Sequence, residues 1–302
     1  MSNVPKRFKE IIINTYGQAG VLWLEQLESI IASCAHKWGL EQVQPFHTLS
    51  YNYVVQAYSQ VYKAHVALKL AVEDSAFSNE QQALEFYNGQ GCVALLDSDA
   101  TYKALLLQKI TPGTALDTLF AIADNRAVIY TVEIIKKLHS NKQLPACHQY
   151  FGIQKWLNVL YSFTDERVPR ASIIFARQLA EQLLQTAQES YLLHGDLHHG
   201  NILFSNQKGW IAIDPKGIAG ELAYEVGAFI RNPFPELILQ AHAQEIIARR
   251  LNQFSELLHI DRTRLARWAY VQAIIATCWA CEDQDPSWQN LLSIATLIQN
   301  QL

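Results

Sequence analysis

One stretch of the chain, residues 191–217, limits the possible folds more than any other. It begins with a short apolar run, which leads into a polar loop that contains Asp196 and ends at Asn201. A second apolar run, a turn and a third apolar run follow, and the third run leads to Asp214. Short apolar runs between turn residues are typical of strands. The stretch therefore predicts strand, loop, strand, turn and strand, with all three polar residues at loop positions.

These three polar residues suit the chemistry of a nucleoside triphosphate. An aspartate, an asparagine five residues later and an aspartate after a hairpin form an arrangement that is used for phosphoryl transfer. ATP brings several negative charges, so magnesium ions must be held by hard oxygen ligands, which Asn201 and Asp214 supply. Asp196 then stands free of the metal, where it orients an acceptor hydroxyl and takes its proton. The spacing thus predicts three catalytic residues, two of which are metal ligands.

The residues in and after this stretch also carry a resemblance to a known family. The strings HGDLHHGNIL, IDPKG and GELAYEVGAFIRNP resemble the aminoglycoside/hydroxyurea antibiotic-resistance kinases, which include streptomycin 6-phosphotransferases. The similarity extends over roughly residues 45–285 and reaches, more distantly, all phosphotransferases that share the protein-kinase fold. It implies an α+β fold with two lobes, a small antiparallel-sheet N-lobe and a mostly helical C-lobe. It also implies an enzyme that uses ATP and Mg²⁺ to phosphorylate an alcohol group of an aminoglycoside-like, streptomycin-type acceptor.

Apolar residues ahead of this stretch form first a helical pattern and then a pattern typical of a sheet. Residues 6–38 predict two amphipathic helices, which separate near Gly17 and Gly20. From residue 42 to 110 the runs are short and predict a small antiparallel sheet, interrupted by one helix from Ser78 to Gly89. The expected strands are Phe46–Leu49, Tyr53–Tyr58, Val61–Lys63, His65–Leu70, Val93–Leu96 and Lys103–Lys109.

After residue 116 nearly every apolar pattern is helical, and Thr114 is the candidate cap at the start of this part. A chain of 302 residues is long enough for two lobes, because single cores stop growing near this size. We expect N-terminal helices and a nucleotide-binding lobe in residues 1–110, and the catalytic loop and acceptor site in residues 111–302. The expected helices are Asp124–His139, Tyr150–Phe163, Arg170–Tyr191, Ala223–Ile230, Pro235–Leu258, Arg262–Cys281 (capped by Asp261) and Trp288–Leu302.

Within the first domain, Lys69 is the candidate phosphate-binding lysine. It lies between apolar residues on a predicted strand, the position from which a kinase lysine holds the α and β phosphates. Glu80 lies at the start of the expected helix, in a context that resembles the family's helix, and we expect it to pair with Lys69. Glu85 is the alternative partner.

Two further segments bear on nucleotide binding. The phosphate-covering loop of kinases is glycine-rich, because only glycine lets backbone N–H groups approach phosphates closely. The corresponding hairpin in this chain has no glycine, so Ser50 and Asn52 are expected to supply side-chain donors, or the loop lies further from the phosphates. By resemblance, the backbone groups of Gln108, Lys109 and Ile110 form the hinge that meets the adenine edge.

Acidic residues after the catalytic stretch suggest a cationic acceptor. Several carboxylates lie at the start of one predicted helix, where Glu221 and Glu225 stand, and at the end of another, in the segment WACEDQD. Acidic groups at a helix C-terminus face the negative end of the dipole, so either a function or a solvated helix end explains them. The resemblance favours a function, since streptomycin kinases have a similar segment and act on a guanidinium-bearing sugar. The expected acceptor contacts are Asp196, Glu221, Trp279, Glu282 and Asp283.

Composition excludes several other classes. The net charge is −4 without long runs of one sign, so the chain has no electrostatic footprint for nucleic acid or a membrane surface. No apolar run is long enough to span a bilayer, and the N-terminus lacks the apolar region of a secretory signal, so we expect a cytoplasmic protein. Cys278 and Cys281 have the spacing of a redox or zinc half-site, but buried free thiols are the expected interpretation.

Other functions remain open from the sequence. His194, His198 and His199 together with Asp196 are also compatible with a zinc hydrolase. A catalytically inactive nucleotide-binding or scaffolding domain is the main alternative from another class, because the phosphate-covering loop has no glycine. Within kinases a protein substrate is disfavoured, since no activation-segment pattern follows Asp214. A different small metabolite as acceptor is the remaining alternative, because fold and catalytic residues are shared by enzymes with different substrates.

Overall fold

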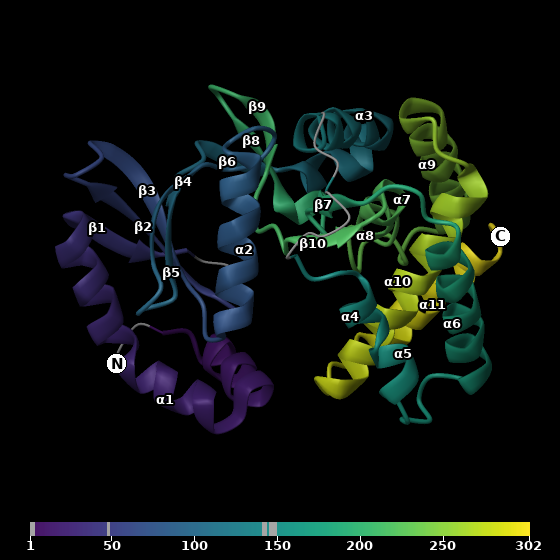
Figure 1. Ribbon diagram of the computed structural model, residues 1–302, viewed down its shortest axis with the longest axis horizontal. Helices are drawn as coiled ribbons and strands as arrows, with labels where there is room; N and C mark the ends of the chain where they lie inside the picture. Colours follow the sequence, from purple (N-terminus) through teal and green to yellow (C-terminus); the bar gives the residue numbers. More distant parts are fainter. Residues whose placement is uncertain (1–3, 47–48, 141–143, 145–149) are drawn as a thin grey trace. The chain divides into compact units, whose positions relative to one another are not determined.

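The structure, a computed structural model, describes residues 4–46, 49–140, 144 and 150–302. The chain divides into two compact units, Met1–Thr111 and Pro112–Leu302 (Figure 1). The first unit holds one antiparallel sheet and two helices, and the second is mostly helical with short strands. The predicted α+β architecture, with a small antiparallel sheet and a mostly helical region, is confirmed.

The sheet of the first unit has two faces with different partners. Its strands follow the order β1-β2-β3-β5-β4. One face packs against helix α1 (Lys6–Trp38), and the shared core includes Val55, Leu68 and Leu106. Since successive strand residues alternate between faces, the other face carries Lys69 and its neighbours. The elements are α1, β1 (Leu40–Pro45), β2 (Tyr53–Ser59), β3 (Ala64–Leu70), α2 (Asp74–Tyr87), β4 (Leu95–Asp99) and β5 (Ala104–Gln108).

Several predicted boundaries in this unit change. Gly17 has a non-helical conformation and separates α1 into two segments, as the sequence predicted. The strand predicted over Val61–Lys63 is wrong, because these residues form the turn between β2 and β3. Phe46 and Leu49 lie outside the strands, and the residues between them lie outside the described part of the chain. Helix α2 begins at Asp74, whose charge suits a helix N-terminus, so Glu80 stands in its middle and not at its start.

The second unit is built around helix α10 (Arg262–Glu282), most of whose side chains are buried. The predicted cap is confirmed, since the Asp261 carboxylate accepts the N–H of Arg264 at 2.8 Å. The other helices are α3 (Phe120–Leu138), α4 (Gln154–Leu157), α5 (Val159–Ser162), α6 (Arg170–Gln185), α7 (Leu222–Glu225), α8 (Gly227–Ile230), α9 (Ala243–Leu258) and α11 (Trp288–Gln299). Among the described residues, no helix is long and apolar enough to cross a membrane.

Several predicted boundaries in the second unit are wrong, and the helix predicted over Tyr150–Phe163 is two short helices that begin at Gln154. Thr114 lies in strand β6 (Pro112–Ala115) and does not cap a helix, because this segment pairs with β8 (Ile202–Ser205). The helix predicted to reach Tyr191 ends at Gln185, since Tyr191–Leu193 forms β7 and pairs with β10 (Ile218–Gly220). The helix predicted from Pro235 begins only at Ala243, and the residues before it form consecutive turns, in which Ile238 donates its N–H to the Pro235 carbonyl and Gln240 to that of Leu237.

Candidate active site

The short strands of the second unit bring Asp196, Asn201 and Asp214 to neighbouring loops. Strand β7 leads into the loop with Asp196, and β8 begins directly after Asn201. Strand β9 (Gly209–Ala212) pairs with β8 and leads to Asp214. The N–H of Ile213 donates to the carbonyl of Asn201 at 2.9 Å, which holds the two expected metal ligands at the ends of paired strands. The predicted succession of strand, loop, strand, turn and strand is confirmed.

A buried carboxylate fixes the loop that carries Asp196. Glu225 accepts the backbone N–H groups of His194 at 2.8 Å and Gly195 at 2.9 Å, and lies 3.3 Å from His139. Burial opposes ionisation of Glu225, but the contacts with His139 and the loop outweigh it and lower the pKa of this carboxyl. The sequence analysis named Glu225 among the acidic residues that suggest a cationic acceptor, whereas the structure buries it and makes it a positioning residue.

Gly195 is required by the geometry of the same loop. Its φ of +83° lies in a region that other residues rarely adopt. A Cβ at this position would stand 2.8 Å from the side chain of Ile218 and 3.0 Å from that of Trp156. The glycine therefore lets the loop turn tightly and present the next residue, Asp196.

Asp196 has cationic neighbours that keep it ionised. Arg231 donates to its carboxylate at 3.1 Å, and His198 lies 3.8 Å from the other oxygen. Burial raises the pKa of Asp196, but the nearby His198 and the charges of Arg231 and Lys216 together outweigh burial and lower this pKa below the ordinary value. An ionised carboxylate beside a partly exposed loop can accept a proton, which fits the predicted base. Arg231 was not predicted as a site residue, although it lies in the string that carried the resemblance.

The side chains of Asn201 and Asp214 offer hard oxygen atoms of the kind that magnesium prefers. The Asn201 amide nitrogen donates to the Asp196 carbonyl at 3.0 Å, which leaves its amide oxygen for a cation. Asp214 has a φ of +62° and its carboxylate faces a cation already, the ammonium of Lys216 at 2.6 Å. The donor set and this cation-facing carboxylate fit a magnesium site.

A second buried network anchors the loop between Asp196 and Asn201. Arg250 on α9 makes bonds of 3.0 and 2.6 Å to the two oxygens of Asp124 on α3, and one of 3.3 Å to His199. The His199 ring stacks on Phe229 with centroids 3.9 Å apart. Burial lowers the pKa of His199 to about 3, so this ring is neutral. The sequence analysis missed Asp124 and Arg250, which lie far from the loop along the chain.

The histidines do not form the zinc site that the sequence left open. His194 is buried and its Nε2 lies 2.8 Å from the carbonyl oxygen of Ile213, whereas His199 points into the Arg250 network. Within the described ranges, no group of three or more His, Cys, Asp or Glu side chains is arranged to hold a metal. Cys278 and Cys281 are buried free thiols, as expected.

A cavity of about 240 Å³ lies beside Asp196 within the second unit. Three of its nine lining residues are aromatic, and the ring of predicted residue Trp279 stands edge-on to that of Trp156 at 5.8 Å. Arg231 reaches Gln272 on α10 at 3.3 Å as well as Asp196. The cavity is lined by Trp156, Gly195, Asp196, Lys216, Tyr224, Arg231, Gln272, Ile275 and Trp279.

The predicted acidic contacts lie at different places. Glu282 and Asp283 are exposed and do not line the cavity. Glu282 is the last residue of α10, three residues after Trp279, and Asp283 is the C-cap that follows it. Residues three apart share a helix face, so the Glu282 side chain lies one turn beyond Trp279 on the same face of α10. Glu221 is not brought to the cavity, because its carboxylate is bound by Arg264 at 2.5 and 2.8 Å and by Trp268.

The first unit holds the expected lysine and glutamate together. The Lys69 ammonium lies 2.5 Å from the Glu80 carboxylate, and both side chains are buried. The alternative partner Glu85 is exposed and accepts a bond from Gln81 instead. This ion pair holds Lys69 on the sheet face opposite α1, and binding of phosphates by Lys69 stays a prediction.

The remaining nucleotide candidates lie on the same unit. Ser50 is exposed in the hairpin between β1 and β2, where its hydroxyl is accessible to a ligand. Gln108 and Lys109 donate their backbone N–H groups to Ala94 and His65 within the unit. Among these three described residues, Ile110 is therefore the one whose backbone N–H we expect to meet the adenine base.

Comparison with known proteins gives consistent results. A sequence model of the family described as "Aminoglycoside/hydroxyurea antibiotic resistance kinase" matches residues 37–284. The chain is 28% identical to a hydroxyurea phosphotransferase of Kitasatospora aureofaciens, over 93% of this chain and 81% of the relative. It is 24% identical to a streptomycin 6-kinase of Streptomyces glaucescens, over 93% and 91% of the two chains.

Solved structures share the fold at low identity. The choline kinase LicA from Streptococcus pneumoniae superposes with a TM-score of 0.66 at 14% identity, covering 91% of this chain and 99% of that one. The aminoglycoside phosphotransferase APH(4)-Ia, in a ternary complex with ADP and hygromycin B, gives a TM-score of 0.62 at 14% identity, covering 90% and 98%.

Proposed function

Because the chain belongs to the aminoglycoside/hydroxyurea antibiotic resistance kinase family, we propose that it transfers the γ-phosphoryl group of ATP to a hydroxyl of a cationic, aminocyclitol-like acceptor. Membership of this family makes the chain a small-molecule phosphotransferase with an alcohol group as acceptor. The observation that carries the finer proposal is the Asp196 carboxylate, which lines an aromatic cavity beside its cationic neighbours.

Asp196 acts as the base in this proposal. Its lowered pKa keeps it ionised at neutral pH, so it accepts the acceptor's hydroxyl proton as the oxygen bonds to phosphorus and ADP leaves. Arg231 orients the carboxylate, and Glu225 holds the backbone before it. Asp196 then gives up this proton to the phosphorylated product or to solvent.

Nucleotide binding is proposed for groups on both units. Lys69, oriented by Glu80, binds the α and β phosphates, and Ser50 and the hinge backbone at Ile110 contribute on the first unit. Asn201 and Asp214 would hold Mg²⁺, which neutralises the charge of the phosphates. The complex of APH(4)-Ia with ADP supports an adenine nucleotide as co-substrate. Since ATP is the expected co-substrate, we expect the reaction in the cytoplasm.

Aromatic walls and rim carboxylates support a cationic acceptor. Rings of Trp156, Tyr224 and Trp279 offer faces for cation–π contact. Burial and the neighbouring charge of Asp283 raise the pKa of Glu282, so a bound cation would relieve the repulsion between these two carboxylates. The relative that is a streptomycin 6-kinase supports the same class of acceptor.

A small neutral hydroxyl compound is the second candidate. A cavity of about 240 Å³ with Arg231 and Gln272 on one side suits a compact polar molecule. The relative that is a hydroxyurea phosphotransferase supports this alternative.

Release of ADP with a panel of acceptors tests the proposal. The purified protein with ATP and Mg²⁺ is mixed with streptomycin, hydroxyurea or choline, and the same panel is run with Asp196→Asn. We expect acceptor-dependent release with streptomycin that the variant lacks. Release with hydroxyurea alone favours the second candidate. Absence of ADP release with every acceptor, together with no thermal shift by ATP and Mg²⁺, contradicts both candidates.

A further inference from the structure

The face of the first unit's sheet that lies opposite α1 carries its side chains in rows. Strand pairing places Val54, Lys69 and Leu105 in one row, and Gln56, Ala67 and Leu107 in the next. A third row holds Tyr58 and His65, and Lys109 joins it through its N–H to the His65 carbonyl. Strand residues rise by about 3.3 Å each, so successive rows on one face are about 7 Å apart. A nucleotide whose phosphates bind Lys69 and whose base extends along this face reaches the second and third rows.

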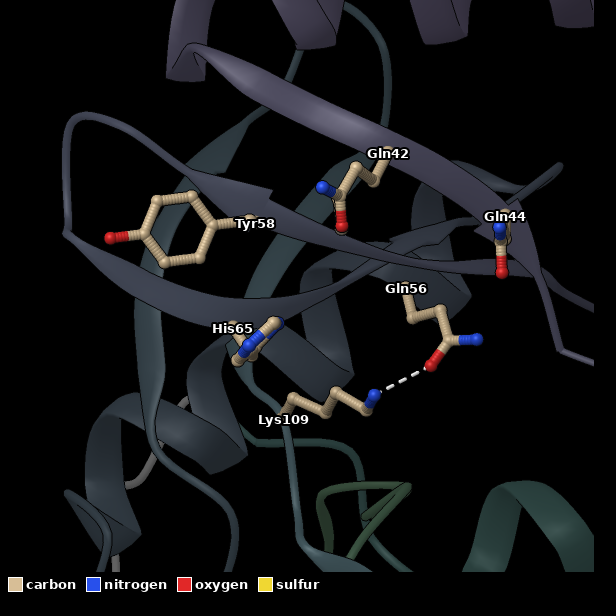
Figure 2. Close-up of a pocket in the computed structure, with 7 residues that line it drawn as sticks. Gln42, Gln44, Gln56, Tyr58, His65 and Lys109 are labelled. Carbon is tan, nitrogen blue, oxygen red and sulfur yellow. Dashed lines mark hydrogen bonds between the residues drawn. The ribbon is translucent and has the colours of Figure 1, made fainter.

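From the second row to the third, the side chains change from mainly apolar to polar. Ala67 and Leu107 are apolar neighbours on adjacent strands, which suits the face of a base, whereas the groups beyond them form a polar pocket of about 150 Å³. Figure 2 shows this pocket, with glutamines of β1 and β2, Tyr58, His65 and Lys109 around it. The Lys109 ammonium donates to the Gln56 side-chain oxygen at 2.6 Å, as the dashed line marks.

The Lys109–Gln56 pair presents mainly hydrogen-bond donors. An ammonium has three donors and no acceptor, and the oxygen of Gln56 already accepts one of them, which leaves the amide N–H groups of Gln56. A base edge that meets this pair must therefore offer acceptors. Guanine and hypoxanthine offer the adjacent O6 and N7 acceptors, the edge that lysine reads in guanine, whereas adenine places an amino donor beside N7.

We propose that Lys109 and Gln56 read the base of the phosphoryl donor and admit 6-oxopurine triphosphates, GTP and ITP, alongside ATP. This inference rests on the proposed kinase function and adds a specificity determinant to it. Lys109 donates to O6 and N7 of the 6-oxopurine, and Gln56 holds the ammonium in place. ITP lacks the 2-amino group of guanine, so use of both nucleotides identifies the O6/N7 edge as the feature that is read.

The test compares donors and uses binding as a second readout. We expect kcat/KM of the wild type for GTP and ITP to lie within tenfold of that for ATP or above it. In Lys109→Met the values for GTP and ITP fall at least tenfold while that for ATP changes less than threefold. Calorimetric titration with non-hydrolysable GTP and ATP analogues, without acceptor, shows the same selective loss. Lys109→Arg keeps the donors and retains the use of GTP.

Lys63→Met is the matched control, because this lysine is exposed in the turn between β2 and β3. A wild type that uses ATP with more than tenfold preference overturns the inference, as does equal loss for all donors in Lys109→Met. In either case ATP is still bound and used, so the proposed kinase function stands. Failure of every triphosphate to bind removes the kinase function itself and this inference with it.

Discussion

The catalytic loop and the acceptor rim of the second unit differ in how firmly their charges are held. The loop around Asp196 is fixed by the buried carboxylate of Glu225 and by the Arg250 network, each through several bonds. The rim carboxylates Glu282 and Asp283 are exposed at the end of α10. Buried charges without partners are costly, so the loop tolerates few changes, whereas exposed charges change at little cost to stability. The difference predicts that chemistry is set in the loop and acceptor choice at the rim.

The largest expected effect comes from Asp214→Ala. The change removes the only carboxylate among the two proposed metal ligands, so we expect magnesium-dependent ATP turnover to be abolished. Asp214 is partly exposed, and the fold should be retained by circular dichroism and thermal melting. Steady-state turnover over a magnesium titration is the measurement, and turnover at ordinary magnesium concentration would show that the metal is held elsewhere.

Asp196→Asn should have the next largest effect. Loss of the base should lower kcat by roughly 10²- to 10⁴-fold, while ATP binding measured by calorimetry stays nearly unchanged. The side chain keeps its size and can still accept a bond from Arg231, so the loop should stay in place. A variant that keeps a tenth or more of turnover, on an acceptor for which chemistry limits the rate, contradicts the role of Asp196.

The sequence alone was sufficient to predict the site residues that lie close together along the chain. Asp196, Asn201 and Asp214 lie within one short stretch, and their spacing alone predicted their common location. Lys69 and Glu80 needed the resemblance and the motif around Asp196, because lysine and glutamate are common surface residues. The start of α2 was placed four residues too late. The anchors were missed because their partners are remote: Glu225 bonds a residue 31 positions away, Arg231 one 35 away and Arg250 one 126 away. Contacts between residues so far apart along the chain leave no periodic pattern in the local sequence.

Glu225→Gln tests how firmly the catalytic loop is held, without changing a group that contacts the reacting atoms. The amide keeps one acceptor oxygen but cannot accept both loop N–H groups as well as a carboxylate does. Leaving a buried donor unsatisfied costs about 1–3 kcal/mol, so we expect a lower melting temperature and a kcat reduced roughly 10-fold.

The split between kcat and KM separates positioning by Glu225 from general destabilisation. At a temperature where the variant is fully folded, kcat should fall while KM for ATP stays within twofold. Equal loss in both parameters, or loss that disappears once unfolded protein is accounted for, would mean that Glu225 only stabilises the fold. Glu221→Gln is the matched control, because its carboxylate bonds Arg264 outside the cavity.

The smallest effect on stability is expected at the rim, where Glu282→Gln and Asp283→Asn remove charge from the end of α10. Both side chains are exposed, and an exposed acidic group faces the negative end of the helix dipole, so each change should leave stability equal or slightly higher. For a cationic acceptor, kcat/KM should fall at least tenfold because the carboxylates no longer pair with it. Values for ATP at saturating acceptor should change little, and Asp285→Asn, further along the same segment, serves as control. Equal loss for acceptor and ATP, or no loss at all, removes Glu282 and Asp283 from the acceptor site and leaves the aromatic cavity as its only determinant.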